Sequence, residues 1–300
     1  MTIAVQQSER NQLLEMLRIV AAYGIVAYHA KTPLHDLVYS GLIIFLVLSP
    51  LVDIHYRWKN PRSAAQLANV LLIPWFFWSM IYALINIVTN RPMIVTGDLV
   101  TGILYGTSPH LWFLPYIFVV LASVNTLKKA NRPDLVFWAS LSLGIALLLT
   151  ADLWSPVLLN CAPPFAQWIH AVPPTLIGIA IGAMYKLRLG PAIICVLVPL
   201  ALVFLGFQEV AGVSIPYVIG ILSVMFLFYF GIYWNPHLWN IRAISELTMG
   251  VYLSHMIWVG IFNNILGRGT FVAATAAFLA AAAMVGVLHR YLPVSRRFLG

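Results

Sequence analysis

Charged residues are scarce in this chain of 300 residues, since Asp, Glu, Lys and Arg together make up only 9%. A soluble domain usually carries about a quarter charged residues, because its surface must present groups that water solvates. Hydrophobic residues make up 61% of the chain, and the mean hydropathy is +0.90. The composition therefore excludes an ordinary soluble domain and predicts an integral membrane protein.

Cysteine is also scarce, with only Cys161 and Cys195 present. We expect no disulfide, because Cys195 lies within an apolar run while Cys161 lies in a loop at the other leaflet. The His and Cys spacings of zinc sites, the Gly-rich phosphate loop and the GxSxG motif are all absent, so we expect no metal site. The net charge of +8 does not indicate nucleic-acid binding, because the basic residues fall in short loops between apolar runs.

Apolar runs of about 20 residues, long enough to cross a bilayer as a helix, recur along the chain. They predict an all-α bundle of about ten transmembrane helices, forming a single integral membrane domain over residues 1–300. The first dozen residues lack the apolar core of a signal peptide, so we expect the first run to be retained. Prolines in 152–175 leave a re-entrant or interfacial segment open, and with it nine or eleven crossings. The expected spans are 14–30, 37–54, 67–88, 110–127, 134–151, 168–186, 190–208, 214–234, 243–266 and 271–289.

Lysine and arginine are divided unevenly between the two sides of this predicted bundle. Only Lys31, Arg91 and Arg268 fall on one side, and Arg18 lies just inside the first span. Because short basic loops stay in the cytoplasm during insertion, the opposite side is predicted to be cytoplasmic and to hold both termini. The basic residues on that side are Arg10, Arg57, Lys59, Arg62, Lys128, Lys129, Arg132, Lys186, Arg188, Arg242, Arg290, Arg296 and Arg297.

The first predicted span carries three ionisable residues, Glu15, Arg18 and His29. Such groups are costly at membrane depth, which makes each one a functional candidate. Eleven residues of helix correspond to three turns plus roughly 20°, so Arg18 and His29 share one face about 16 Å apart. Ordinary structural roles compete with this interpretation. Arg18 can extend to the lipid interface or pair with Glu15, and His29 can be an interfacial histidine.

Other polar residues are predicted on the outer side or within the bilayer, although the linear sequence does not show that they meet. His35 and Asp36 fall in the first outer loop, and His255 lies midway along the ninth span. His110 opens the fourth span and His170 the sixth. For each histidine, a role in core or interface packing is the alternative to a functional one.

The first span resembles a motif of the acyltransferase 3 family, polytopic membrane enzymes that acylate sugars and other envelope acceptors. In that motif an acid precedes Arg or Lys by three positions, and His follows after ten intervening residues. Glu15, Arg18 and His29 match this spacing.

Later segments resemble the family in the same order, so the resemblance covers essentially the whole chain. IIFLVLSP is similar to a family run that closes in FxxSG, with Ser49 kept and Pro50 where Gly is usual. HLWFLPY resembles the family's WFL element. ISELTMGVYLSH resembles its S-x-G-x-Y-L-x-H stretch, in which the aligned residues are Thr248, Gly250, Tyr252 and His255.

The resemblance implies a membrane O-acyltransferase of the bacterial inner membrane. It would move a short acyl group, with acetyl expected, from cytoplasmic acyl-CoA to a hydroxyl of an envelope polysaccharide, exopolysaccharide or lipid-linked sugar. Acyl-CoA would be a substrate, and no permanently bound cofactor is expected. The expected partners are the lipid bilayer, acyl-CoA, the saccharide acceptor and polysaccharide-assembly proteins, with no nucleic acid.

This chemistry assigns roles to particular residues. We expect Arg57, Lys59 and Arg62, a basic cluster that also resembles the family's, to bind the donor's phosphates. We expect His29 to be the base that deprotonates the acceptor. Arg18 would orient the donor or the first helix through Glu15. The remaining candidates are His110, Tyr252 and Tyr28 for the oxyanion, His255 as a further catalytic residue, and Asp36, Tyr28 and Tyr252 for substrate binding.

A proton-coupled secondary transporter is the alternative from another class, with His29, Arg18, Glu246 and His255 as a relay. Such a transporter would favour inverted repeats with matching broken helices, which the sequence lacks. A cytoplasmic cavity sized for pantetheine would favour the enzyme, and alternating cavities would favour the transporter. A purely structural membrane subunit is a third possibility.

Overall fold

The computed structural model describes residues 11–93, 98–187, 191–233 and 241–299, and this part of the chain contains helices and no strand. Long helices lie at all ten expected spans. They are α1 Gln12–His29, α2 His35–Arg57, α3 Ala64–Val88, α5 Phe113–Lys129, α6 Pro133–Leu149, α8 Phe165–Leu187, α9 Ala192–Gln208, α10 Ser214–Tyr233, α12 Thr248–Leu266 and α13 Phe271–Tyr291. The short helices are α4 Leu99–Tyr105, α7 Ala151–Trp154, η1 Pro156–Asn160, α11 Ile241–Ser245, η2 Pro293–Ser295 and α14 Arg296–Leu299.

Among the described residues, 6 helices are long and apolar enough to cross a membrane: α2, α3, α8, α10, α12 and α13. The chain is therefore a multi-pass membrane protein. α6 and the α7–η1 segment after it pass the same test together, but they are bent by 68°. The bend lies at the start of the proline-containing region 152–175, for which the sequence did not decide between a membrane crossing and a re-entrant or interfacial segment. The count of ten spans and the cytoplasmic termini remain predictions.

The expected span 243–266 is divided in the structure. α11 ends at Ser245 and α12 begins at Thr248, whose hydroxyl donates to the Ser245 carbonyl at 2.7 Å. Ser245 is the last residue of α11, so this bond satisfies one of the carbonyls that a helix end leaves without an intrahelical partner. The break also places the Ser245 hydroxyl so that it donates to the Glu15 carboxylate on α1.

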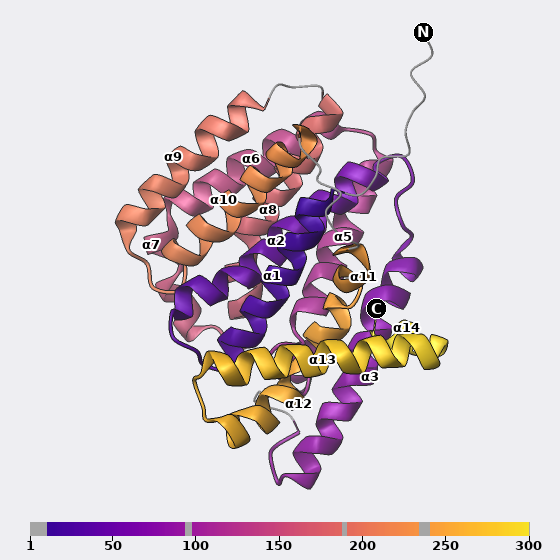
Figure 1. The fold of residues 1–300 in the computed structure, drawn as a ribbon. Coiled ribbons are helices and arrows are strands. Elements are labelled where there is room, and N and C mark those ends of the chain that lie inside the picture. The colour runs from indigo at the N-terminus through magenta and orange to yellow at the C-terminus, as the bar shows by residue number, and fades with distance from the viewer. Residues whose placement is uncertain (1–10, 94–97, 188–190, 234–240, 300) are drawn as a thin grey trace.

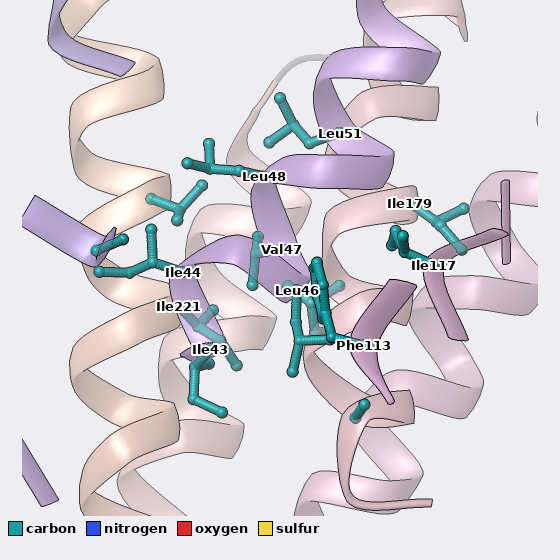
Figure 2. Packing of buried hydrophobic residues seen from close by; sticks show 14 of the residues in the cluster. Ile43, Ile44, Leu46, Val47, Leu48, Leu51, Phe113, Ile117, Ile179 and Ile221 are labelled. Carbon is teal, nitrogen blue, oxygen red and sulfur yellow. The ribbon is translucent and has the colours of Figure 1, made fainter. Parts of the chain in front are cut away.

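α2 lies at the centre of the bundle and packs against α1, α8 and α10, as Figure 1 shows. Its buried residues Ile43, Leu46 and Leu51 point in different directions around the helix axis, toward neighbouring helices (Figure 2). A helix that is apolar on all sides is expected to be buried. α13, by contrast, crosses the lower part of the bundle at a steep angle to α1 and packs on α12 (Figure 1).

Glycine allows the closest approaches to α2. A Cβ on Gly178 of α8 would lie 2.2 Å from the carbonyl oxygen of Val47, and a Cβ on Gly41 would lie 2.5 Å from that of Ala21 on α1. Small residues at such points let membrane helices pack backbone to backbone. The position of α1 against α2, which places the candidate site, depends on this contact.

Candidate active site

Three histidines that are distant in sequence meet at one end of α1. His29 comes from the end of α1, His110 from the turn before α5 and His255 from the middle of α12. The ring centroids are 5.1 Å apart for His29 and His255, 4.8 Å for His110 and His255, and 6.2 Å for His29 and His110. We refer to these three residues as the histidine cluster.

His110 is fixed by hydrogen bonds at both ring nitrogens. Its Nε2 lies 3.3 Å from the Leu253 carbonyl oxygen, and its Nδ1 lies 3.1 Å from the Ser108 hydroxyl. A carbonyl can only accept, so Nε2 carries the proton and Nδ1 accepts from the hydroxyl. The Tyr252 hydroxyl donates to the backbone carbonyl of His110. His110 therefore has no nitrogen left to act as a base.

His255 is fully buried and bonded at only one nitrogen. Its Nδ1 lies 2.6 Å from the Tyr252 carbonyl oxygen, which places the proton on Nδ1. Its Nε2 is buried and has no hydrogen-bond partner among the described residues. The free lone pair of His255 is therefore enclosed within the histidine cluster, beside the ring of His29.

His29 faces a cavity of about 250 Å³, which we call the outer cavity. Its wall is largely aromatic and also contains the side-chain amide of Gln167. His255 does not line this cavity, whereas both of its ring neighbours in the cluster, His29 and His110, do. The lining residues are Ile25, Tyr28, His29, Tyr39, Leu42, Tyr105, Pro109, His110, Trp112, Phe113, Gln167 and Tyr252.

The opposite end of α1 borders a larger cavity of about 650 Å³, which we call the inner cavity. Its wall contains Arg18, Arg57 and Arg62. Arg18 donates to both oxygens of the Glu15 carboxylate, at 3.1 and 3.0 Å. Neither Arg57 nor Arg62 has a carboxylate within ion-pair distance in the described part of the chain. The inner cavity therefore offers two arginines whose charge is not cancelled by an ion pair.

A mainly apolar cavity of about 280 Å³, the middle cavity, lies between the other two. It shares Arg18, Ser49 and Leu121 with the inner cavity. It shares four wall residues with the outer cavity, which we call the neck: Ile25, Leu42, Phe113 and Tyr252. The three cavities thus follow one another along α1, from the arginines to His29.

The structure brings most of the sequence-predicted residues to this row of cavities. His29, Tyr28 and Tyr252 line the outer cavity together, and Glu15 lines the inner cavity with the arginines. Lys59 is exposed and does not line the inner cavity. Asp36 does not line the outer cavity and lies with its carboxylate 3.6 Å from His35.

Two further candidate residues do not take part in the proposed sites: His170 lies apart from the histidine cluster, and Glu246 belongs to no buried relay. His170 stacks on Tyr217, and its Nδ1 lies 2.5 Å from the Tyr217 hydroxyl. Glu246 borders the middle cavity but accepts from Arg242 at 2.9 Å, in an ion pair whose side chains are both more than half exposed.

Sequence reasoning missed a buried polar group at the inner cavity. Lys128, which the charge pattern assigned to a loop, has a fully buried side chain and forms an ion pair with Asp53 of α2. Asn125, one turn earlier on α5, accepts from Lys128 at 2.8 Å. The sequence offered one indication of this group: Asn125 and Lys128 are three residues apart and therefore lie on the same face of a helix.

In the described residues no group of three or more His, Cys, Asp or Glu side chains is arranged to hold a metal ion. The cysteines Cys161 and Cys195 are both free thiols.

Comparison with known proteins agrees with the resemblance seen in the sequence. No curated protein and no solved structure shows a significant match. The family model described as an acyltransferase domain (Acyl_transf_3) matches residues 11–290, which include the histidine cluster and the walls of all three cavities. The chain therefore belongs to the acyltransferase 3 family.

Proposed function

We propose that this protein transfers a short acyl group, acetyl in the first instance, from cytoplasmic acyl-CoA to a sugar hydroxyl. The acceptor would be an envelope polysaccharide, an exopolysaccharide or a lipid-linked saccharide at the bacterial inner membrane. One observation carries this proposal, namely the row of cavities along α1 with arginines at one end and His29 at the other.

The inner cavity suits the nucleotide part of acyl-CoA. Guanidinium groups bind phosphate oxygens through paired, charge-assisted hydrogen bonds. Arg57 and Arg62 are available for this, because no carboxylate in the described part of the chain engages either one. Arg18 is held by Glu15, and Glu15 accepts from Ser245 of α11, so Arg18 fixes the wall of the cavity rather than acting as a mobile charge.

The middle cavity suits the slender pantetheine arm of the donor. Its wall residues Phe45, Leu48 and Ile117 are apolar. The helical rise from Arg18 to His29 is about 16 Å, so an extended arm can begin at the arginines and end beside the base. The neck then admits the thioester to the outer cavity, where the acceptor binds against Tyr39, Trp112 and Gln167.

The chemical step follows from the free nitrogens of the histidine cluster. The acceptor hydroxyl gives its proton to His29 as its oxygen attacks the thioester carbonyl carbon. The tetrahedral oxyanion takes a hydrogen bond from a wall donor, for which Tyr28 is best placed because the Tyr252 hydroxyl already donates to the His110 carbonyl. When the carbon–sulfur bond breaks, the CoA thiolate takes the proton from His29 and the ester remains on the acceptor.

His255 has a positioning role in this scheme. A proton on the His29 nitrogen nearer to His255 can be donated to the free Nε2 of His255, and catalytic hydrogen bonds of this kind often close only when the substrate is bound. The other His29 nitrogen then keeps its lone pair toward the outer cavity. The ring of His110 and the backbone carbonyl of Tyr252 also contact the ring of His255 and hold it in place.

The test is transfer of label from radiolabelled acetyl-CoA to the saccharide fraction in inverted membrane vesicles that contain the protein. We expect label in that fraction with the unaltered chain and none above background with His29→Ala at equal abundance. His289→Ala is the matched control, because His289 lies on α13 and lines none of the three cavities. If label in the saccharide fraction is independent of His29, the proposed chemistry is wrong.

A further inference from the structure

We infer that Asp53, Lys128 and Asn125 form a positioning network that sets the charge of the inner cavity and presents Arg62 to the donor's phosphates. This inference rests on the proposed function, because the ligand it concerns is the nucleotide end of acyl-CoA. None of the three residues belongs to the motifs through which the chain resembles its family.

The network joins two helices by direct contacts at its centre. The Lys128 ammonium on α5 donates to the side chain of Asp53 on α2, to the Asp53 backbone carbonyl at 3.2 Å, and to the Asn125 amide oxygen at 2.8 Å. The exposed fractions of the two charged side chains are 0% for Lys128 and 7% for Asp53. All three donor positions of the ammonium are thereby used within the protein.

Asn125 extends the network to the basic loop. Its amide nitrogen donates to the backbone carbonyl of Arg62 at 3.1 Å. Arg62 follows the end of α2, between Arg57 and the start of α3, where no regular helix fixes the backbone. The contact from Asn125 therefore ties the chain at Arg62 to the end of α5.

The charge of Asp53 explains why Lys128 is needed. Asp53 lines the inner cavity together with Arg57 and Arg62, so its carboxylate faces the same space as the proposed phosphates. Burial and the neighbouring Arg57 lower the pKa of Arg62 while Asp53 opposes this effect, which shows that the three charges act on one another. Lys128 cancels the charge of Asp53 and leaves the two free arginines to attract an anion.

Three variants of this pair should change CoA binding with different signs. Lys128→Met leaves a carboxylate in the cavity without compensation, and the dissociation constant for CoA should rise by about 10-fold to 100-fold. Asp53→Asn leaves the Lys128 charge and its bond to Asn125 in place, so CoA should bind equally well or more tightly. The double variant Asp53→Asn/Lys128→Met restores the net charge, and its dissociation constant should return to within about 5-fold of the original.

Free CoA is the probe, titrated by calorimetry into the purified full-length protein in lipid nanodiscs. A purely structural role for the pair predicts that all three variants weaken CoA binding, with the double variant no better than Lys128→Met. That pattern would overturn the inference. If Lys128→Met does not accumulate in the membrane, the sign of the Asp53→Asn effect decides, because weakening by about 10-fold or more contradicts a role for Lys128 in cancelling the carboxylate charge.

The exposed ion pair of Arg132 and Asp134 is the matched control. Arg132 donates to Asp134 at 3.1 and 2.9 Å just beyond the end of α5, outside the inner cavity. Arg132→Met/Asp134→Asn should leave CoA binding unchanged, because exposed pairs contribute little. Absence of CoA binding by the unaltered protein would instead contradict the proposed donor, and with it this inference.

The arm through Asn125 has its own test. If Asn125 acts through Arg62, then Asn125→Leu alone should raise the dissociation constant for CoA. In a protein that already carries Arg62→Ala, adding Asn125→Leu should raise that constant by no more than about 2-fold. Independent effects that multiply in the double variant Asn125→Leu/Arg62→Ala would remove Asn125 from the network.

Discussion

The rings of His255 and His29 are neighbours, with their centroids 5.1 Å apart, and of these two residues only His29 lines the outer cavity. The Nδ1 of His255 is bonded to the Tyr252 carbonyl, and its Nε2 is buried without a partner among the described residues. A lone pair enclosed beside a second imidazole can orient that imidazole, as the third member of a catalytic triad orients its histidine. We therefore expect substitutions of either histidine to slow acyl transfer, but to different extents.

His29→Ala should lower acyl transfer by about 10²–10⁴-fold, the usual contribution of a positioned general base. His29→Gln should be nearly as inactive, because an amide forms hydrogen bonds but does not accept a proton. Membrane abundance should change little for either variant. Label transferred per folded molecule is the measurement, and substantial activity in His29→Gln would remove His29 as the base.

His255→Gln should keep part of the acyl-transfer activity, because the amide oxygen can still accept a hydrogen bond from His29. His255→Leu cannot accept one, so its activity should be lower than that of His255→Gln by about 10-fold or more. The loss should appear in kcat, with the KM for acetyl-CoA unchanged, because His255 touches neither substrate. A change confined to KM, or equal activity in His255→Gln and His255→Leu, would contradict a role through His29.

Arg57→Ala and Arg62→Ala should each raise the KM for acetyl-CoA. A charge-assisted contact to phosphate is worth about 1.5–3 kcal/mol when it is desolvated and less when it is exposed. Arg62 is half-buried and Arg57 is exposed, so Arg62→Ala should have the larger effect. Lys59→Ala is the matched control, because Lys59 lies in the same loop but outside the inner cavity. An unchanged donor KM in both arginine variants would place the donor elsewhere.

Reporter fusions after Arg62 and Lys129 should report the cytoplasm, and fusions after Lys31 and Arg91 the external side, because of the uneven charge of the loops. A cytoplasmic signal is also predicted after Arg188, which lies outside the described residues. Lys129 and Arg91 reporting the same side would contradict the scheme of ten spans.

Gly178→Ala should lower stability by about 1–3 kcal/mol, because the added carbon would meet the backbone of Val47 at 2.2 Å and neither helix can move without repacking. The unfolding midpoint in detergent is the measurement. Gly260→Ala on α12 is the control, since a Cβ added there would meet no described atom within 4 Å apart from its chain neighbours and the nearby backbone of its own helix, and its midpoint should not fall. Equal midpoints for the two variants would show that α8 is not held tightly against α2.

Hydropathy and helical periodicity were sufficient to predict much of this arrangement. The ten long helices lie where apolar runs were expected, and Arg18 and His29 do border two cavities along the same helix. Both results depend on local properties of the chain, namely the length of apolar runs and the angle between residues on a helix.

The contacts between helices could not be predicted in this way. The meeting of His29, His110 and His255 joins residues up to 226 positions apart, and no local pattern fixes which helices are neighbours. Lys128 shows the same limit, because a lysine at a helix end is usually exposed, and its burial depends on Asp53 from a different helix. The break between α11 and α12 was not predicted either, because the expected span 243–266 runs through the polar residues Ser245, Glu246 and Thr248 without an interruption.

The neck formed by Ile25, Leu42, Phe113 and Tyr252 has a consequence for the membrane as a permeability barrier. A row of water-filled cavities through a bilayer would carry protons and ions down their gradients. A constriction of apolar side chains is poorly wetted and blocks such flow without a moving gate. In the proposed reaction the donor's own arm would fill the neck during transfer, so an acyl group would cross the membrane without a leak of protons or ions through the cavities.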